Sequence, residues 1–327
     1  MLNTRRLKRR RKNFLGPLSS FVDISNRIYD VSPDCKYIIA GGNIENRLTI
    51  MSLKKPEIYN VPTPHHLPVS CVSIDIDCAS PGTSFNGSLT GVGGTSTLAV
   101  RLFAITGSLD STCAVWNLSD LPSTSLIQTL CGHSGPVTSV SLSMFLDVAL
   151  TGSEDGTVNL HSVIRGQFLH SITPGFLNSA TLSINFVVLT RSGQIYIQWQ
   201  NGLTPSKDKS KSSSASCSAN HPKQFLSVYS LHANHISTCE LGHSKVTALS
   251  VVPKCLGSLN HCCLIGNVKG ELVILDGYYL TDQKTLNFQN SILDVQLLSP
   301  NGQHLVVALS NGCLIISTVS LSNIDKQ

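Results

Sequence analysis

Charged and aromatic residues are scarce in this sequence: they make up 13% and 6% of its 327 residues, against 41% hydrophobic residues. It contains no HExxH zinc motif, no GxSxG nucleophile motif and no glycine-rich loop followed by Lys-Ser/Thr. No apolar run approaches the about 20 residues that a membrane-spanning helix needs. We therefore expect a cytoplasmic protein that is not an enzyme and that needs no cofactor or metal.

The cysteines do not form a disulfide or zinc pattern. They number eleven, an odd count, and no two of them are spaced as CxxC. Most lie inside apolar runs, such as Cys71 in "VSCVSI", Cys113 in "TCAVW" and Cys313 in "NGCLII". We interpret them as buried free thiols in a reducing compartment.

The basic character of the chain is confined to one segment near the N-terminus, "RRLKRRRK". Without its seven charges the formal net charge of +5 becomes −2, so the remainder is slightly acidic. Such a run attracts phosphates, either of nucleic acid or of an anionic membrane. We expect residues 1–13 to be a disordered tail, and its possible electrostatic contacts come from Arg5, Arg6, Lys8, Arg9, Arg10, Arg11 and Lys12.

Two stretches of the chain repeat one pattern. "TGSLDSTCAVWNL" begins at Thr106 and "TGSEDGTVNLHSV" begins at Thr151, 45 residues later. Looser copies bring the count to six units, each with three short β-branched runs and usually a weak fourth, as in "LIQTLCGH" and "ISTCEL". Four short strands repeated at this period predict an all-β fold, a β-propeller with six recognisable blades.

The repeat also resembles the WD40 pattern, in which a Gly-His, a Ser/Thr, a turn Asp and a Trp form one internal network. The unit that best fits this pattern supplies His133, Thr151, Ser153 and Asp155, but His161 stands where Trp belongs. The resemblance implies a structural role for these residues rather than a catalytic one.

Two other units carry parts of the same pattern. The unit before keeps Asp110 and Trp116 but has no Gly-His ahead of it, and a second Gly-His places His243 before "KVTALSVV". We expect the pair His65-His66, in the Pro-rich "NVPTPHHLP", to be solvated. His161 and His304 fall in strands, and we expect them to be core residues with their hydrogen bonds satisfied.

"GSEDGTVNLHSVIRGQF", from Gly152 to Phe168, is similar to a blade of neurobeachin-like proteins, a branch of the BEACH-domain family. "LGPLSSFVDISNRIYDVSPDCKYIIAGG", "NRLTIMSL", "AITGSLDSTCAVW" and "HLVVALSNGCLII" fit the same propeller in the same order. The resemblance implies the C-terminal WD40 propeller of a trafficking scaffold. Its partners would be the adjacent BEACH domain and vesicle or granule machinery, with possible peripheral association with endomembranes.

The resemblance also defines domain boundaries. The propeller would span 14–320, with disordered insertions at 79–98 and 201–223 and a tail at 321–327. Six units are one fewer than the seven that the family implies. Either a blade lies upstream, so that the intact protein has seven, or "FLGPLSSFV" closes a smaller ring.

Binding, in this interpretation, uses loops at a propeller rim, and we single out 134–136, 244–245 and 43–46. No small-molecule substrate is expected, and nucleic acid is the less favoured partner. The alternative is a WD40 substrate receptor or a nuclear, nucleic-acid-associated scaffold, for which the basic run of residues 5–12 would be the address. A third class, a propeller hydrolase, requires a metal or a charged cluster that the sequence does not reveal.

Overall fold

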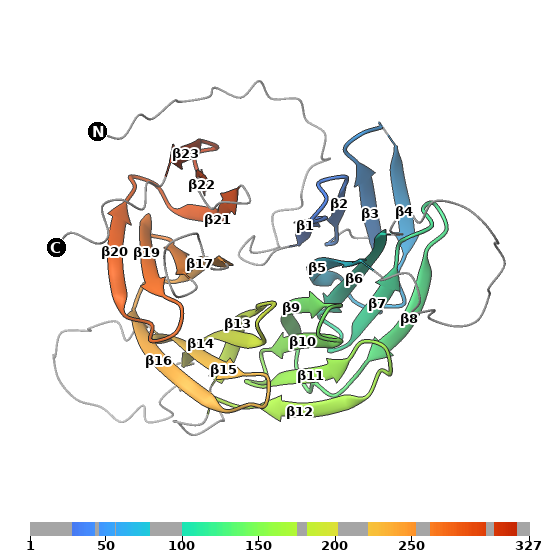
Figure 1. Cartoon of the computed structure of the whole chain (residues 1–327), viewed down its shortest axis with the longest axis horizontal. Coiled ribbons are helices and arrows are strands. Elements are labelled where there is room, and N and C mark those ends of the chain that lie inside the picture. Colours follow the sequence, from blue (N-terminus) through green and yellow to red (C-terminus); the bar gives the residue numbers. More distant parts are fainter. Residues whose placement is uncertain are drawn as a thin grey trace, which may run out of the picture. The chain divides into compact units, whose positions relative to one another are not determined.

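A computed structural model describes residues 28–42, 46–55, 57–78, 100–174, 182–201, 222–252, 262–298 and 304–318. All regular structure in these residues is β-strand, arranged as six antiparallel sheets (Figure 1). The predicted tails, the insertion at 79–98, most of the insertion at 201–223 and the segment "FLGPLSSFV" lie outside the described residues. The chain divides into two compact units, Arg27–Ile172 and Met1–Asn26 with Thr173–Gln327, which we call the first and the second unit.

The first unit contains three four-stranded sheets, blades 1 to 3, in each of which consecutive strands are neighbours. Their strands are β1 (Tyr29–Val31), β2 (Tyr37–Ala40), β3 (Arg47–Ser52), β4 (Ile58–Pro62), β5 (Val69–Cys78), β6 (Val100–Ser108), β7 (Cys113–Asn117), β8 (Ser125–Leu130), β9 (Val137–Ser143), β10 (Val148–Ser153), β11 (Val158–Ser162) and β12 (Phe168–Ile172).

The second unit contains blades 4 and 5, of four strands each, and blade 6, which has three strands in the described residues. Their strands are β13 (Leu182–Leu189), β14 (Gln194–Asn201), β15 (Gln224–Ser230), β16 (His235–Gly242), β17 (Val246–Val252), β18 (Cys262–Asn267), β19 (Glu271–Asp276), β20 (Asp282–Asn287), β21 (Ile292–Leu298), β22 (His304–Leu309) and β23 (Leu314–Thr318).

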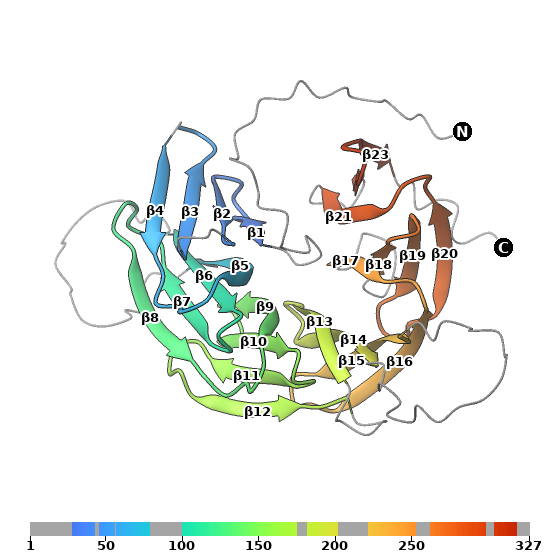
Figure 2. The same cartoon turned by 180° about the vertical axis from the view of Figure 1, so that it is seen from behind.

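The blades of the first unit stack through their faces. Strands β1, β5 and β9 lie side by side at the inner edges, whereas β4, β8 and β12 form the outer edges (Figures 1 and 2). The middle strands β10 and β11 are buried at every residue, because both faces of their sheet are covered. The outer strand β12 leaves Phe168 and Leu169 exposed.

Gly107 marks how closely blades 2 and 3 approach. A Cβ at this position would lie 2.6 Å from Cys71 Sγ and 2.6 Å from Val137 Cγ1. Because carbon atoms do not approach so closely, only glycine fits here. Four-stranded antiparallel meanders that stack in this way are the blades of a β-propeller, so the six predicted units are confirmed.

The prediction of buried thiols is right in part. Cys71, Cys113 and Cys263 are buried, and burial raises the pKa of the Cys71 thiol to about 12. Cys239, Cys262 and Cys313 are partly buried, whereas Cys35 and Cys131 are exposed, so the prediction is wrong for these last two. Cys78, Cys217 and Cys255 lie outside the residues whose side chains are described. Cys35 lies in the turn between β1 and β2, and Cys131 follows the last residue of β8, outside the alternation that buries strand residues.

Candidate functional site

Two hydrogen-bonded turns dominate one end of the first unit. At this end, which we call rim A, the link between two blades meets the turn between the second and third strands of a blade. Backbone N–H groups join these loops: Thr63 donates to Asn46 O (3.1 Å), Leu109 to Pro68 O (3.2 Å) and Glu154 to Pro136 O (3.0 Å). The opposite end, rim B, carries the other turns of each blade.

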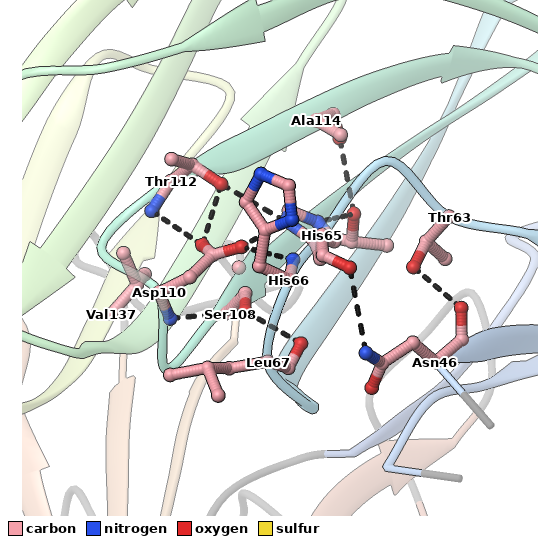
Figure 3. A network of polar contacts seen from close by, with 12 residues as sticks. Asn46, Thr63, His65, His66, Leu67, Ser108, Asp110, Thr112, Ala114 and Val137 are labelled. Carbon is pink, nitrogen blue, oxygen red and sulfur yellow. Dashed lines mark hydrogen bonds and ion pairs between the residues drawn. The ribbon is translucent and has the colours of Figure 1, made fainter. Parts of the chain in front are cut away.

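In blade 2, a buried histidine connects the strands to the turn (Figure 3). His65 Nε2 lies 2.9 Å from Thr106 Oγ1, and the Trp116 indole N–H donates to the same oxygen over 3.1 Å. His65 Nδ1 lies 3.0 Å from Thr112 Oγ1. Because the Thr112 hydroxyl donates to Asp110, its oxygen must accept from the His65 Nδ1–H, so Nε2 accepts from Thr106.

This assignment gives one continuous chain of hydrogen bonds that ends at the Asp110 carboxylate. Asp110 accepts from the Thr112 hydroxyl (2.6 Å), the Thr112 N–H (2.9 Å) and the His66 N–H (2.8 Å). Its Oδ2 also lies 3.5 Å from His65 Nδ1. The indole of Trp116, deep in strand β7, is thereby connected to a carboxylate at the rim.

The solvated position predicted for His65 is therefore wrong. Its side chain is buried, and it takes the place of the missing Gly-His in blade 2. The signal was present in the sequence, since "HHLPVS" at His65 matches "HSGPVT" at His133 in its His, Pro, Val and hydroxyl positions. Sequence reasoning also missed Thr112 and its counterpart Thr157, which complete the two turns.

Blade 3 repeats the arrangement with the residues that the sequence predicts. His133 Nδ1 lies 3.1 Å from Asp155 Oδ2, and its Nε2 lies 2.8 Å from Thr151 Oγ1. Asp155 accepts from the Ser134 N–H (2.9 Å) and from the Thr157 hydroxyl (2.7 Å). The Ser153 hydroxyl donates to Gly135 O over 3.0 Å, which ties the link to the strand end.

The network of blade 3 stops short at its third strand. His161 occupies the place that Trp116 has in blade 2. Thr106 pairs with Ala114, two residues before Trp116, and Thr151 pairs with Asn159, two residues before His161. Its ring packs edge-on against Phe168, with centroids 5.6 Å apart. His161 is buried, as predicted. Neither ring nitrogen makes a hydrogen bond of normal geometry in the described residues, so the prediction that its hydrogen bonds are satisfied is wrong.

The structure does not bring His243 into such a network. Its side chain is exposed and makes no hydrogen bond in the described parts of the second unit. The turn of blade 5, "GNVKGE", has Lys269 where blade 3 has Asp155. The carboxylate of this turn, Glu271, accepts instead from the Asn267 amide over 2.7 Å. The loop is held instead by its backbone, because the Val268 N–H donates to Lys245 O.

The two turns carry negative charge without a cationic partner. Burial acts to raise the pKa of Asp110, but hydrogen bonds from Thr112 and His66 outweigh it and hold the pKa below its ordinary value. Asp155 follows the same pattern, with Thr157 and Ser134 as donors. Burial lowers the pKa of His65 although the Asp110 charge opposes this. Both aspartates are thus ionised at neutral pH, and neither contacts Lys or Arg in the described residues.

Both networks hold loops in place through hydrogen bonds between their own side chains and backbone. The described residues contain no group of three His, Cys, Asp or Glu side chains placed to hold a metal ion. They also contain no helix long and apolar enough to cross a membrane. The His304 side chain lies outside the residues whose side chains are described.

Comparison with known proteins defines the class of fold. The family model "WD domain, G-beta repeat" matches residues 124–162, which include His133 and Asp155. The crystal structure of the WD40 β-propeller domain of Doa1 superposes with a TM-score of 0.59 at 15% identity, covering 90% of this chain and 78% of that one. The computationally designed Ika8 protein gives 0.56 at 13% identity, covering 90% and 70%. The chain is an all-β WD40 β-propeller, a fold that generally mediates protein binding and is typically non-catalytic.

Two curated relatives define a narrower group. BEACH domain-containing protein lvsD of Dictyostelium discoideum is 26% identical over 179 residues, or 54% of this chain. BEACH domain-containing protein B of Arabidopsis thaliana is 24% identical over 187 residues, or 49% of this chain. The propeller is therefore homologous to a region of BEACH domain-containing proteins, as its sequence indicates. The match spans only 6% of the length of either relative.

Replacing Thr106 by Val tests the blade 2 network. The change leaves the Trp116 N–H and His65 Nε2 without their shared partner, and each unpaired buried group costs about 1–3 kcal/mol. Thr151→Val is the matched control, because it removes the equivalent contacts to a histidine and to a strand carbonyl, while no indole donates to Thr151. We expect the larger fall in the free energy of unfolding, measured by urea titration, for Thr106→Val. Equal falls would contradict the account.

Acidification should destabilise the protein through its buried neutral histidines. Burial lowers the pKa of His65 and His161 below their ordinary value of 6.5, so the unfolded chain binds more protons than the folded one. Their contribution is complete above pH 6.5 and is lost as the pH falls below it. We expect the free energy of unfolding to fall from pH 7.5 to 5.5, and to fall less in His161→Phe. An unchanged pH slope in that variant would refute the assignment for His161.

Proposed function

We propose that this chain is a non-catalytic protein-interaction scaffold, the C-terminal propeller of a neurobeachin-like BEACH protein that acts in the cytoplasm in vesicle or granule trafficking. The similarity to BEACH domain-containing proteins of Dictyostelium and Arabidopsis is the observation that carries the proposal. The adjacent BEACH domain and the trafficking machinery would be its partners, with peripheral association with endomembranes.

The proposed mechanism is rigid display of rim loops. In the link 134–136, each of the three residues is held: the Ser134 N–H by Asp155, the Gly135 carbonyl by Ser153 and the Pro136 carbonyl by the Glu154 N–H. A partner that docks on loops already ordered does not have to order them on binding. This favours loop 134–136 as a binding site. Of the loop 43–46, only Asn46 is described.

The second candidate is a WD40 substrate receptor or a nuclear, nucleic-acid-associated scaffold. It is favoured by the basic run of residues 5–12, which would serve as its nuclear localisation signal. The rim loops themselves do not support a nucleic-acid surface, since Asp110, Glu154 and Asp155 would repel phosphates.

Proximity labelling in cells distinguishes the two candidates. The full chain, fused to a labelling enzyme, is expected to label BEACH-containing and vesicle proteins in the cytoplasm. The matched control replaces the seven basic residues of 5–12 by glutamine, and we expect the labelled set to stay the same. Labelling of nuclear proteins that disappears in the glutamine variant would establish the second candidate and reject the first.

A further inference from the structure

Two exposed leucines lie on adjacent loops of rim A in blade 2. Leu67 is 47% exposed and Leu109 is 43% exposed. Leu67 lies just before β5 and Leu109 directly follows β6. The Ser108 hydroxyl donates to Leu67 O over 2.9 Å, and the Leu109 N–H donates to Pro68 O over 3.2 Å. Figure 3 shows Leu67 beside Ser108 and Asp110. Hydrogen bonds therefore fix the backbone of both leucines, which places two exposed apolar side chains on neighbouring loops beside the Asp110 network.

Blade 3 adjoins this surface on the same rim. The Ser70 hydroxyl, at the start of β5, donates to Val137 O at the start of β9. Gly107, the neighbour of Ser108, packs against the Val137 side chain. The turn with Glu154 and Asp155 belongs to the same end of blade 3, because the Glu154 N–H donates to Pro136 O beside Val137.

The charge around the two leucines is of one sign. Loops 63–68, 109–112, 131–136 and 154–157 contain Asp110, Glu154 and Asp155 and no Lys or Arg. The side chains of Asp110 and Asp155 are only 9% and 10% exposed, and they accept hydrogen bonds from neutral backbone and hydroxyl groups, so no side chain in the described residues cancels their charge. Glu154 is the exposed acidic group, which a partner can contact directly. In blade 1, the basic residue Arg47 begins β3 next to Asn46, whose side-chain amide donates to His65 O over 3.4 Å.

Rim B of the same unit provides the contrast. It exposes Phe145, at 78%, and Ile164, at 45%. Its described loops carry both signs of charge, with Lys54, Lys55 and Arg165 beside Asp34, Glu57 and Asp120. Rim B therefore favours neither a basic nor an acidic partner, which makes Phe145 a suitable control position.

We infer that rim A of blades 2 and 3 binds a basic peptide segment with leucine-like side chains, which contact Leu67 and Leu109 while its Arg or Lys groups lie beside Glu154 and the two turn carboxylates. This inference rests on the proposed scaffold function and specifies the class of partner. Apolar contact supplies the attraction at the centre, and the carboxylates at its border exclude acidic segments. Since Glu154 is exposed, binding weakens as the salt concentration rises.

Fluorescence anisotropy with the full chain tests the inference. The probe is a fluorescein-labelled ten-residue peptide of alternating leucine and arginine, and a matched peptide has glutamate in place of arginine. We expect the arginine peptide to bind and the glutamate peptide not to bind. Leu109→Ser should weaken binding about tenfold and Glu154→Gln about threefold. Phe145→Ser, the rim B control, should leave the affinity unchanged.

No binding of the arginine peptide would overturn the inference, as would an equal loss of affinity in Leu109→Ser and Phe145→Ser. Circular dichroism of each variant checks that the fold is retained. We expect it to be retained, because each substituted residue is exposed. The proposed function has its own test, the proximity-labelling experiment. It is rejected if the full chain labels no cytoplasmic vesicle proteins. If such labelling persists while the peptide does not bind, the scaffold proposal stands and this partner chemistry is wrong.

Discussion

The hydrogen bonding of two carboxylates, Asp110 and Asp155, is the interaction on which the described rim depends. Each accepts from the N–H of the inter-blade link and from the N–H and hydroxyl of the turn, and each lies within reach of a histidine. Donors to an ionised oxygen form stronger hydrogen bonds than neutral pairs. One side chain thus fixes two loops that are far apart in the sequence, which is how a β-sheet blade presents loops in a defined position.

The histidines connect this rim to the interior. In blade 2 the connection runs through Thr106 to Trp116, which is buried in β7. In blade 3 it reaches Thr151 and ends, because His161 offers no partner at the equivalent place. The two blades therefore share one hydrogen-bonded arrangement, with a tryptophan only in blade 2. Comparing them separates the contribution of the tryptophan to stability from that of the turn.

Much of this could be predicted from the sequence. The strands of all six blades follow from short β-branched runs separated by turn residues, and the His133–Asp155 turn follows from its spacing within one unbroken repeat. His65 was missed because 45 residues, including the insertion, separate it from Asp110, whereas 22 separate His133 from Asp155. His243 was included because it is the histidine of a Gly-His pair, although its turn has Lys269 in place of an aspartate. Local motifs predict local turns, and a network across an insertion requires the fold.

Hydrogen–deuterium exchange on the full chain tests the central claim most directly. If the carboxylates hold rim A, the amides of His66 and Thr112, and those of Ser134 and Thr157, exchange as slowly as amides within the adjacent strands β6 and β10. The amide of Phe145 on rim B is the internal reference, because it makes no hydrogen bond in the described residues, whereas its neighbour Met144 donates to Asp75. We expect the Phe145 amide to exchange faster than the four rim A amides. Exchange of those four amides at the rate of the Phe145 amide would contradict the account, because the carboxylates would then not be holding the loops.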